Sequence, residues 1–362
     1  MPRRPRLRFA PLLVLAAALT ACGRDHGLGV QSTTSTSSGA TTTAGSTSSG
    51  TGGSSSTGTG AGGTSEPPGP TRVTVVNGVN DYDAIRVCFL PYPAGDPGAK
   101  PWPAAATGLL FAHAAVLDLA VDLPANTDVQ PTIFAGDLSK IAGKTCAQAL
   151  ALAASGNDDA GTTAPILAAA LAVLPTSVFT SEKSLLLAPI GCMGGPDHDD
   201  ASAMVGCGDS YTPSTPTVNL IALGMSRKTD PVHVAFQVVN ASVAVEPTDF
   251  GIKSSIMGAG ILTLATALPT GGIEPKPPFT TLTVNELGAP EKVSIKTYLN
   301  GQGMMFPTSD TLMGEAFKNG TVASTQLANG EGYVLVAVGA APNIPAGPFW
   351  HKLTYSLIKA NP

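Results

Sequence analysis

The chain has 362 residues, of which 12% are charged and 43% are hydrophobic, and its formal net charge is −5. An average soluble domain is about 25% charged, so this chain carries roughly half the usual density of charge. Its 41 glycines and 31 prolines would interrupt the long helices of a coiled coil or a helical bundle. No cluster of lysine and arginine follows residue 8, so the composition excludes a strongly basic nucleic-acid-binding protein, and we expect no nucleic-acid partner.

Residues 1–21 have the features of a bacterial signal peptide. Four arginines within residues 3–8 precede the apolar segment Phe9–Leu19, which is too short to span a bilayer because a spanning helix takes about 20 residues. The segment closes with Leu19-Thr20-Ala21-Cys22, which resembles the bacterial lipobox. The resemblance implies cleavage before Cys22, a lipid on its thiol and acylation of the new amino terminus, since stable anchoring needs more than one acyl chain. The alternative is an ordinary signal peptide followed by a chance cysteine.

The residue after Cys22 indicates in which membrane a lipoprotein resides. It is Gly23 rather than aspartate, which by the sorting rule of Gram-negative lipoproteins implies the outer membrane, facing the periplasm or the cell surface. Removal of residues 1–21 removes four arginines and no acid, so the net charge changes from −5 to −9. An acidic and lightly charged exterior suits a surface protein and disfavours polyanionic partners.

Residues 22–70 are predicted to form a disordered tether. Residues 32–65 contain only serine, threonine, glycine and alanine, so they offer nothing to bury that could offset the entropy of folding. The proline-rich stretch 66–70 stiffens the far end. We interpret the tether as a spacer that holds a folded head away from the membrane. O-glycosylation of its hydroxyl groups is an alternative to a purely passive linker.

Residues 71–362 contain two series of alternating apolar segments in the same order, which predicts two β-sandwich domains at 71–228 and 229–362. Both first strands end in Val-Val-Asn, at Asn77 and Asn240. Period-two alternation between turn residues is typical of half-buried strands. The expected strands are 72–77, 85–89, 117–123, 132–134 and 185–190 in the first half, and 233–240, 250–253, 261–265, 293–297 and 334–338 in the second half. We expect helical insertions at 145–154 and 309–318, and an added Ala- and Leu-rich helix at 164–174.

The first half carries a further resemblance. Its Val-Val-Asn opening, Val87-Cys88-Phe89, Leu123-Pro-Ala-Asn-Thr127 and Ala142-Gly-Lys-Thr-Cys146 resemble a family of repeated immunoglobulin-like domains of unknown function, found in bacterial surface lipoproteins and often in tandem. The resemblance covers most of 72–340, although the second copy lacks cysteines. It implies a mainly β fold of two tandem immunoglobulin-like antiparallel sandwiches with short helical insertions. The family carries no established catalytic residues, so the resemblance implies a binding or structural role.

Four cysteines remain beside Cys22: Cys88, Cys146, Cys192 and Cys207. An even number suits disulfide formation in an oxidising compartment. Three pairings are compatible with the sequence. We favour Cys192–Cys207, which closes a loop rich in glycine and aspartate, and Cys88–Cys146, which would tie the first helical insertion to a core strand. The wide spacing disfavours a zinc site.

The loop between Cys192 and Cys207 is the most polar part of the head. Four carboxylates and one imidazole, in the loop and directly after it, could bind Ca²⁺ or a similar hard cation; the candidate ligands are Asp197, His198, Asp199, Asp200 and Asp209. Their spacing is not that of an EF-hand. The alternative is a solvated turn in which aspartate side chains bond to the backbone. We expect no other cofactor.

We therefore expect a non-enzymatic surface lipoprotein with a structural, adhesive or interaction role. The first alternative is a glycan- or Ca²⁺-binding surface protein, because Trp102, Trp350 and Tyr298 could together offer a platform for sugar rings. The second alternative is a secreted hydrolase, because Gly208-Asp209-Ser210 resembles the start of an esterase block. Tyr211 follows the serine where that block has leucine, and an Asp-x-x-His partner is lacking near His351, which disfavours the hydrolase.

Overall fold

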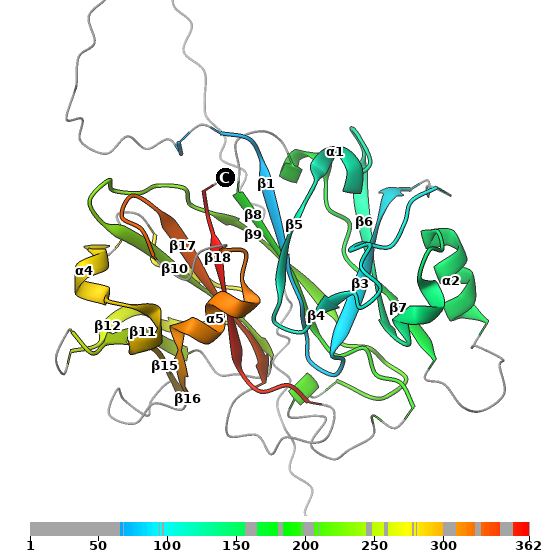
Figure 1. Cartoon of the computed structure of the whole chain (residues 1–362). Coiled ribbons are helices and arrows are strands. Elements are labelled where there is room, and N and C mark those ends of the chain that lie inside the picture. The colour runs from blue at the N-terminus through cyan, green and yellow to red at the C-terminus, as the bar shows by residue number, and fades with distance from the viewer. Residues whose placement is uncertain are drawn as a thin grey trace, which may run out of the picture. The chain divides into compact units, whose positions relative to one another are not determined.

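The structure of the protein is a computed structural model. It describes residues 66–67, 69–93, 95, 98–155, 165–179, 184–196, 198, 206–208, 210–243, 248–256, 260–276, 279, 281–299, 309–322, 327–340 and 350–361. The signal peptide, Cys22 and residues 22–65 of the tether lie outside the described residues. The described residues belong to one compact unit and form mainly β-strands with a few short helices (Figure 1), which confirms the predicted fold class.

The first half of the chain forms two facing sheets. The inner sheet, which faces the second half, has the order β2-β8-β1-β5 with β9 beside β8, and the outer sheet has the order β4-β3-β6-β7. The strands are β1 (Arg72–Val76), β2 (Gly78–Val79), β3 (Ala84–Tyr92), β4 (Leu109–Leu110), β5 (Ala114–Leu117), β6 (Asp128–Gly136), β7 (Ile166–Ala170), β8 (Ser184–Gly191) and β9 (Asn219–Met225). Apolar side chains such as Val75, Val87 and Leu187 fill the space between these sheets.

The second half repeats this arrangement. Its inner sheet has the order β13-β10-β17-β18 with β14 beside β10, and its outer sheet has the order β12-β11-β15-β16. The strands are β10 (Val234–Val243), β11 (Thr248–Ser254), β12 (Leu262–Leu268), β13 (Ile273–Glu274), β14 (Thr281–Leu282), β15 (Val293–Leu299), β16 (Ser309–Leu312), β17 (Gly332–Ala340) and β18 (Thr354–Lys359). The predicted boundary at 228/229 falls between β9 and β10. A second core, with Phe236, Phe250 and Leu335 among its members, lies between these sheets.

A third apolar layer joins the two halves. It contains Leu186 and Ala188 of β8 together with Val334, Val336 and Val338 of β17. Alternate residues of each inner strand therefore face their own sandwich or the other one. This two-sided burial explains why β8 and β17 are buried along their whole length and apolar almost throughout, since a strand covered on both faces has no solvent side. The four sheets consequently stack as layers with three apolar cores between them.

Each inner sheet contains a parallel pair of strands. Strand β1 runs parallel to β8, with Val75 opposite Leu187, and β10 runs parallel to β17, with Val238 opposite Leu335. The strand pairs within the two outer sheets are all antiparallel. A parallel pair requires a long crossover, and the outer sheet of each sandwich supplies it. These parallel pairs differ from the antiparallel sheets predicted from the sequence.

The asparagines of the two Val-Val-Asn ends act alike. Asn77 Nδ2 donates to Leu109 O at 3.0 Å, and its Oδ1 accepts from Val79 N at 3.0 Å. Asn240 Nδ2 donates to Leu268 O at 3.0 Å, and its Oδ1 accepts from Ser242 N at 3.2 Å. Both side chains are fully buried. Asn77 directly follows β1, whereas Asn240 lies within β10. Each asparagine satisfies buried backbone groups beside its strand, since a buried polar group without a partner is costly.

The helices are short and lie at the flanks of the sheets (Figure 1). They are α1 (Leu119–Asp122), α2 (Cys146–Ala154), α4 (Val284–Leu287) and α5 (Met313–Asn319), with 3₁₀ turns at Leu138–Ile141, Thr176–Phe179 and Pro290–Lys292. The helix predicted at 145–154 is confirmed by α2, whose N-cap Thr145 forms a capping box with Gln148. Within the described ranges, the structure holds no helix with the length and apolarity that crossing a bilayer requires.

Three predicted elements were wrong. The predicted helix at 164–174 contains β7, which pairs with β6 from Ile166 to Ala170, so tertiary pairing overrides the helix propensity of alanine and leucine. The predicted strand at 117–123 ends at Leu117, because Asp118 caps α1 by accepting from Ala120 N. In the second half, β12 pairs with β11. The strand in the equivalent position of the first half is β4, which pairs with β3. The predicted helix at 309–318 is helical only from Met313, since 309–312 pair with β15.

Candidate functional site

The four cysteines of the head form two disulfides, Cys88–Cys146 and Cys192–Cys207, with Cα–Cα distances of 5.9 and 5.5 Å. Both predicted pairings are confirmed. The first disulfide joins β3 to the start of α2, and all four cysteines are buried. The second closes a loop whose ends pack against Tyr211 and Trp350. Because Trp350 belongs to the second half of the chain, this loop lies where the two halves meet.

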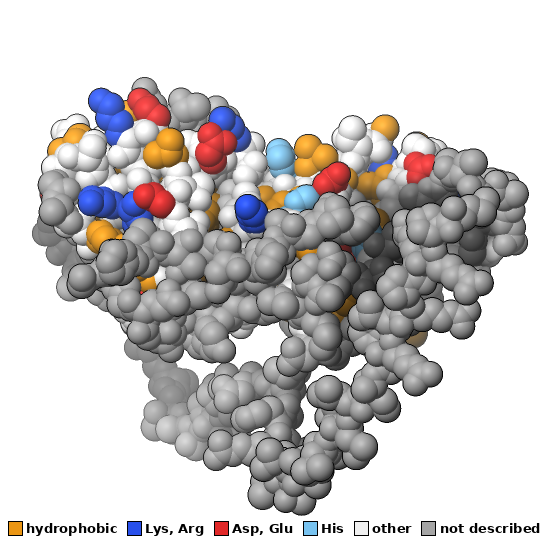
Figure 2. Space-filling view, turned by 90° about the horizontal axis from the view of Figure 1, so that it is seen from below, with side chains coloured by type: hydrophobic (Ala, Val, Ile, Leu, Met, Phe, Trp, Pro, Cys, Tyr) orange, Lys and Arg blue, Asp and Glu red, His pale blue; other side chains and the backbone are white. Residues whose placement is uncertain are grey.

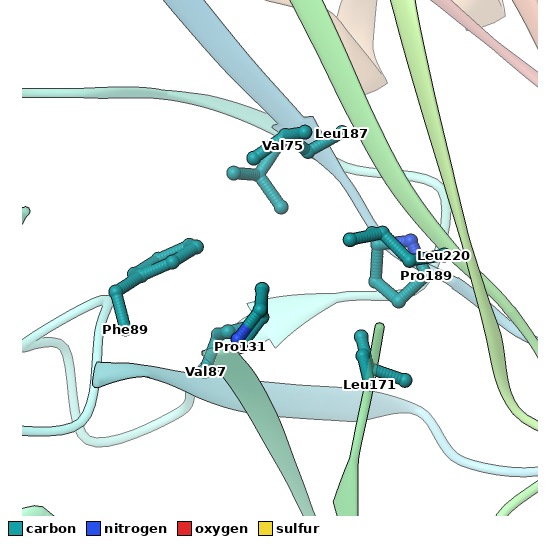
Figure 3. Close-up of a pocket in the computed structure, with 8 residues that line it drawn as sticks. All are labelled: Val75, Val87, Phe89, Pro131, Leu171, Leu187, Pro189 and Leu220. Atoms are coloured by element: carbon teal, nitrogen blue, oxygen red, sulfur yellow. The ribbon is translucent and has the colours of Figure 1, made fainter. Parts of the chain in front are cut away.

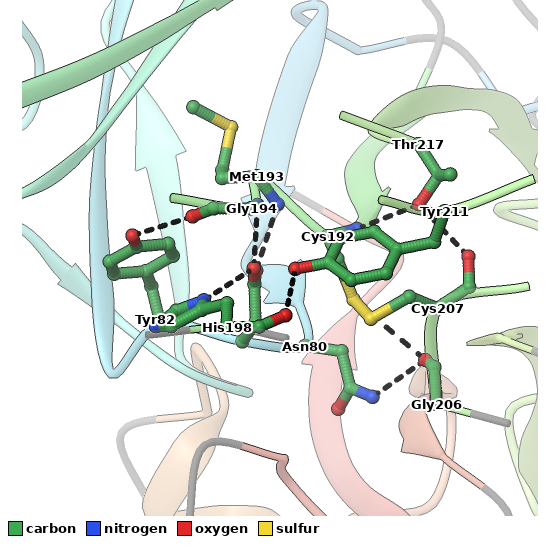
Figure 4. Close-up of polar contacts among 11 residues, drawn as sticks. Asn80, Tyr82, Cys192, Met193, Gly194, His198, Gly206, Cys207, Tyr211 and Thr217 are labelled. Carbon is green, nitrogen blue, oxygen red and sulfur yellow. Dashed lines mark hydrogen bonds and ion pairs between the residues drawn. A yellow bond between two sulfur atoms is a disulfide. The ribbon is translucent and has the colours of Figure 1, made fainter. Parts of the chain in front are cut away.

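A buried carboxylate organises the same region, which Figure 4 shows. Asp81 Oδ1 accepts from Met193 N at 2.9 Å, and Oδ2 accepts from Gly194 N at 2.8 Å. His198 Nδ1 lies 3.1 Å from the same Oδ2. The Asp81 side chain is 0% exposed and that of His198 is 7% exposed. We call Asn80, Asp81, Tyr82, His198, Tyr211 and Trp350 the Asp81 cluster.

Aromatic rings enclose the Asp81–His198 pair. The Tyr82 ring lies 4.9 Å from the imidazole, and its hydroxyl donates to Gly194 O at 2.7 Å. Tyr211 donates to His198 O at 3.0 Å and contacts Trp350 edge-on. Burial, together with the charge of Asp81 and the neighbouring Tyr211, raises the pKa of Tyr82. Tyr82 therefore stays protonated at neutral pH and keeps donating its hydrogen bond to Gly194 O.

Asn80 connects this cluster to the second half of the chain. Its backbone N donates to Gly191 O at 2.7 Å, and its carbonyl accepts from His351 N at 3.0 Å. Its side chain donates to Gly206 O at 2.9 Å, inside the disulfide loop. One residue thus joins the end of β8, the disulfide loop and the segment before β18. The Asp81 cluster fits a structural tie better than a catalytic dyad, because a general base must reach its substrate and both members here are buried.

The predicted cation ligands are only partly described. Asp197, Asp199, Asp200 and Asp209 lie outside the described residues. His198 is buried against Asp81 instead of lying in a solvated loop. Where the structure describes the chain, it brings together no group of three His, Cys, Asp or Glu side chains that could hold a metal ion. Ca²⁺ binding by this loop stays a prediction.

The residues proposed as a sugar platform do not lie on one surface. Tyr298 is 0% and Trp350 is 6% exposed, and both belong to buried cores. Trp102 is half-buried and lines a groove on the first sandwich. The predicted three-residue platform is therefore wrong, and of the three residues Trp102 is the one that lines a surface groove. Ser210 of the esterase-like triplet is exposed.

The remaining described histidines each contact a neighbouring backbone or side-chain group. His113 Nδ1 lies 3.1 Å from Phe111 O, and His233 Nδ1 lies 3.2 Å from Asp230 Oδ1. The ring of His351 stacks on that of Phe111 at a centroid distance of 4.0 Å, and its Nε2 lies 3.3 Å from Asp83 Oδ1. Burial lowers the pKa of His351, although Asp83 and the backbone of Tyr82 oppose this shift. His351 and Phe111 form another contact between the two halves.

Arg227, which is not among the residues predicted to be functional, holds the end of the tether. Arg227 lies between β9 and β10 and is 2% exposed. Its guanidinium donates to Gly69 O at 3.1 Å, to Pro70 O at 2.7 Å and to Ser184 Oγ at 2.8 Å. Its backbone N donates to Glu66 Oε2 at 2.7 Å. Three carbonyl or hydroxyl acceptors in fork geometry suit arginine rather than lysine, but nothing in the sequence around Arg227 signals them.

The described cavities comprise a small internal void and two open surface grooves. Figure 3 shows one between the two sheets of the first sandwich, enclosed by apolar side chains such as Val75, Phe89 and Leu187. Its volume of about 10 Å³ is that of a packing void at most the size of one water molecule. Two open grooves are larger: one of about 430 Å³ beside α5 and one of about 380 Å³ beside Trp102. Both grooves reach the volume of small-molecule sites.

Comparisons with known proteins leave the family open. No protein-family model and no curated protein matches the chain. One similar solved structure is a crystal structure titled "putative cell adhesion protein", from Bacteroides eggerthii DSM 20697. The similarity covers 82% of this chain and 98% of that chain, with a TM-score of 0.20 and 11% sequence identity. A similarity at this level carries no functional argument.

Proposed function

We propose that the chain is a bacterial outer-membrane lipoprotein, anchored through lipid on Cys22, that displays its two-sandwich head on a flexible tether for an adhesive or structural role. The sequence supports the anchor through its basic and apolar leader and the closing Leu19-Thr20-Ala21-Cys22. It supports the tether through residues 32–65, which contain no residue larger than threonine. The membrane is thus one proposed partner, and a surface glycan or protein is the other.

The observation that carries this proposal is the apolar layer between the inner sheets. It joins the two sandwiches into one body through side chains such as Leu186, Val334 and Val336. Domains that must move against each other usually meet through smaller and more polar surfaces. A stiff body on a flexible tether suits a protein that acts by holding a partner rather than by turning over a substrate.

Two further features support a binding head. The described polar cluster around Asp81 is used for internal hydrogen bonds. On the face drawn in Figure 2, the described basic and acidic side chains are interspersed rather than segregated by sign. Such a surface favours solubility and contacts with neutral partners over polyanions.

Attachment of cells tests the proposal. Cells that express the full chain, the Cys22→Ala variant or no chain are compared for retention on glycoprotein-coated and uncoated surfaces. We expect the full chain to increase the number of retained cells and Cys22→Ala to return it to background, because the variant head is no longer held at the membrane. Equal retention by all three strains would contradict the proposal. Turnover of an ester, peptide or glycoside by the purified full chain, abolished in Ser210→Ala, would favour the hydrolase instead.

A further inference from the structure

The groove beside Trp102 has features of a ligand site that the buried Asp81 cluster lacks. It lies on the first sandwich between the segment Gly98–Ala104 and the end of α1, and its floor includes Phe89 of β3. Its volume of about 380 Å³ lies at the lower end of the range for sites that hold small molecules, roughly 300–1,000 Å³. It is open to solvent, so a ligand could enter without any movement of the head.

The wall that carries Trp102 is held at three points. Trp102 exchanges two backbone hydrogen bonds with Val87 of β3, at 2.6 and 2.8 Å. Ala99 O accepts from Cys146 N at 2.7 Å, next to the Cys88–Cys146 disulfide. The buried guanidinium of Arg86 donates to Ala105 O at 2.5 Å. The indole also packs edge-on against Phe89, with ring centroids 6.3 Å apart. A loop fixed in this way loses little entropy when it binds a ligand, which favours affinity.

The opposite wall is formed by the end of α1. Its Val121 is 77% exposed, and its Asp122 is half-buried, with one carboxylate oxygen accepting from Asp118 N at 2.8 Å. Lys100 stands exposed on the Trp102 side. The groove therefore combines an aromatic ring and an apolar rim with one cationic donor and one anionic acceptor, whose charges cancel.

We propose that this groove binds a neutral pyranose unit of a surface glycan. A pyranose has an apolar face of C–H groups, which can stack on an indole, and a rim of hydroxyls, which donate to carboxylates and accept from ammonium groups. An anionic ligand would need an excess of basic groups in the groove. A purely apolar ligand would make no hydrogen bond with Lys100 or Asp122. The inference rests on the proposed function in one respect, because it names the partner class through which the displayed head would adhere.

Binding to immobilised glycans tests the inference directly. The full chain in detergent is applied to an array of neutral hexose and N-acetylhexosamine oligosaccharides, sialylated oligosaccharides and proline-rich peptides. We expect retention on one or more neutral oligosaccharides. Trp102→Ala should reduce the affinity by about tenfold or more, and Asp122→Asn should reduce it to a smaller extent. Tyr92→Ala is the matched control, because Tyr92 is an exposed aromatic residue at the end of β3, the strand to which Trp102 bonds, and it does not line the groove.

Fluorescence provides a second readout that does not depend on the array. The chain has two tryptophans, and Trp350 is buried, so a sugar stacked in the groove should change the emission of Trp102 and protect it from quenching by acrylamide. Trp102→Phe keeps an aromatic ring, and hence the fold, but should abolish this signal.

Three results would overturn the inference: no retention on any neutral oligosaccharide, equal retention by Trp102→Ala, or Trp102-dependent binding of proline-rich peptides alone. Failure here and failure of the proposed function are separable. Cells that attach through Cys22 without binding glycans would leave the display proposal standing. A chain that binds glycans through Trp102 without enhancing attachment would leave the groove assignment standing.

Discussion

Removal of the Asp81 carboxylate should destabilise the head more than almost any other single polar substitution. Asp81→Ala deletes the acceptor of the Met193 and Gly194 backbone N–H groups and of His198 Nδ1. These donors are buried, and a buried donor left without a partner costs about 1–3 kcal/mol, so the loss of all three contacts should lower the free energy of unfolding by about 3–5 kcal/mol. Asp81→Asn retains one acceptor oxygen but places an N–H₂ group against other donors. We therefore expect it to lower the free energy of unfolding by less than Asp81→Ala does.

The measurement is a thermal unfolding curve of the full chain. For a head of about 300 residues, an unfolding entropy of roughly 2.1 cal/mol/K per residue converts this loss into a fall of about 5–8 °C in Tm. Asp83→Ala is the matched control: Asp83 lies two residues away but its side chain is 95% exposed, so its loss should stay within about 0.5 kcal/mol. A Tm for Asp81→Ala that equals that of Asp83→Ala would refute the assignment of Asp81 as a structural tie.

Three further outcomes follow from the geometry. Because burial lowers the pKa of His351 below its usual 6.5, the unfolded chain binds the proton more tightly; stability should therefore fall as the pH falls through 6.5, and His351→Gln should flatten the plot of Tm against pH in that range. Replacement of Cys192 and Cys207 by serine opens a 15-residue loop and should cost about 3 kcal/mol of unfolding free energy in denaturant titrations; an unchanged midpoint would contradict this. Arg227→Met removes three hydrogen bonds to the tether end and Ser184 and should speed protease cleavage near residue 66, as followed by mass spectrometry, whereas an unchanged cleavage rate would show that the clamp is dispensable.

Strands buried on both faces were the easiest elements to predict. The apolar runs of β8 and β17 could only be buried strands or helices, and their length favoured strands. The sequence could not show that alternate residues of these strands serve two different cores. The Ala- and Leu-rich segment 164–174 misled the prediction, because its helix propensity is overridden by pairing with β6.

The polar sites were harder to predict than the fold. The two disulfides could be inferred once Cys88 was placed on a strand and Cys146 at a helix start. The Asp81–His198 pair could not, because its members are 117 residues apart in the sequence and pairs of that kind depend on the tertiary fold. The polar run from Asn80 to Asp83 after a buried strand was the available signal. Trp102 was recognised as a candidate platform, but only the structure separates it from the buried Trp350.

Lipid on Cys22 is what would fix the head to a membrane. Mass spectrometry of the amino-terminal peptide, from chain extracted from membranes, decides whether this lipid is present. We expect a peptide that begins at Cys22 and carries a diacylglyceryl group and an amide-linked acyl chain, both absent in Cys22→Ala. An unmodified amino-terminal peptide, from a chain recovered in the culture medium instead of the membranes, would rule out the lipid anchor.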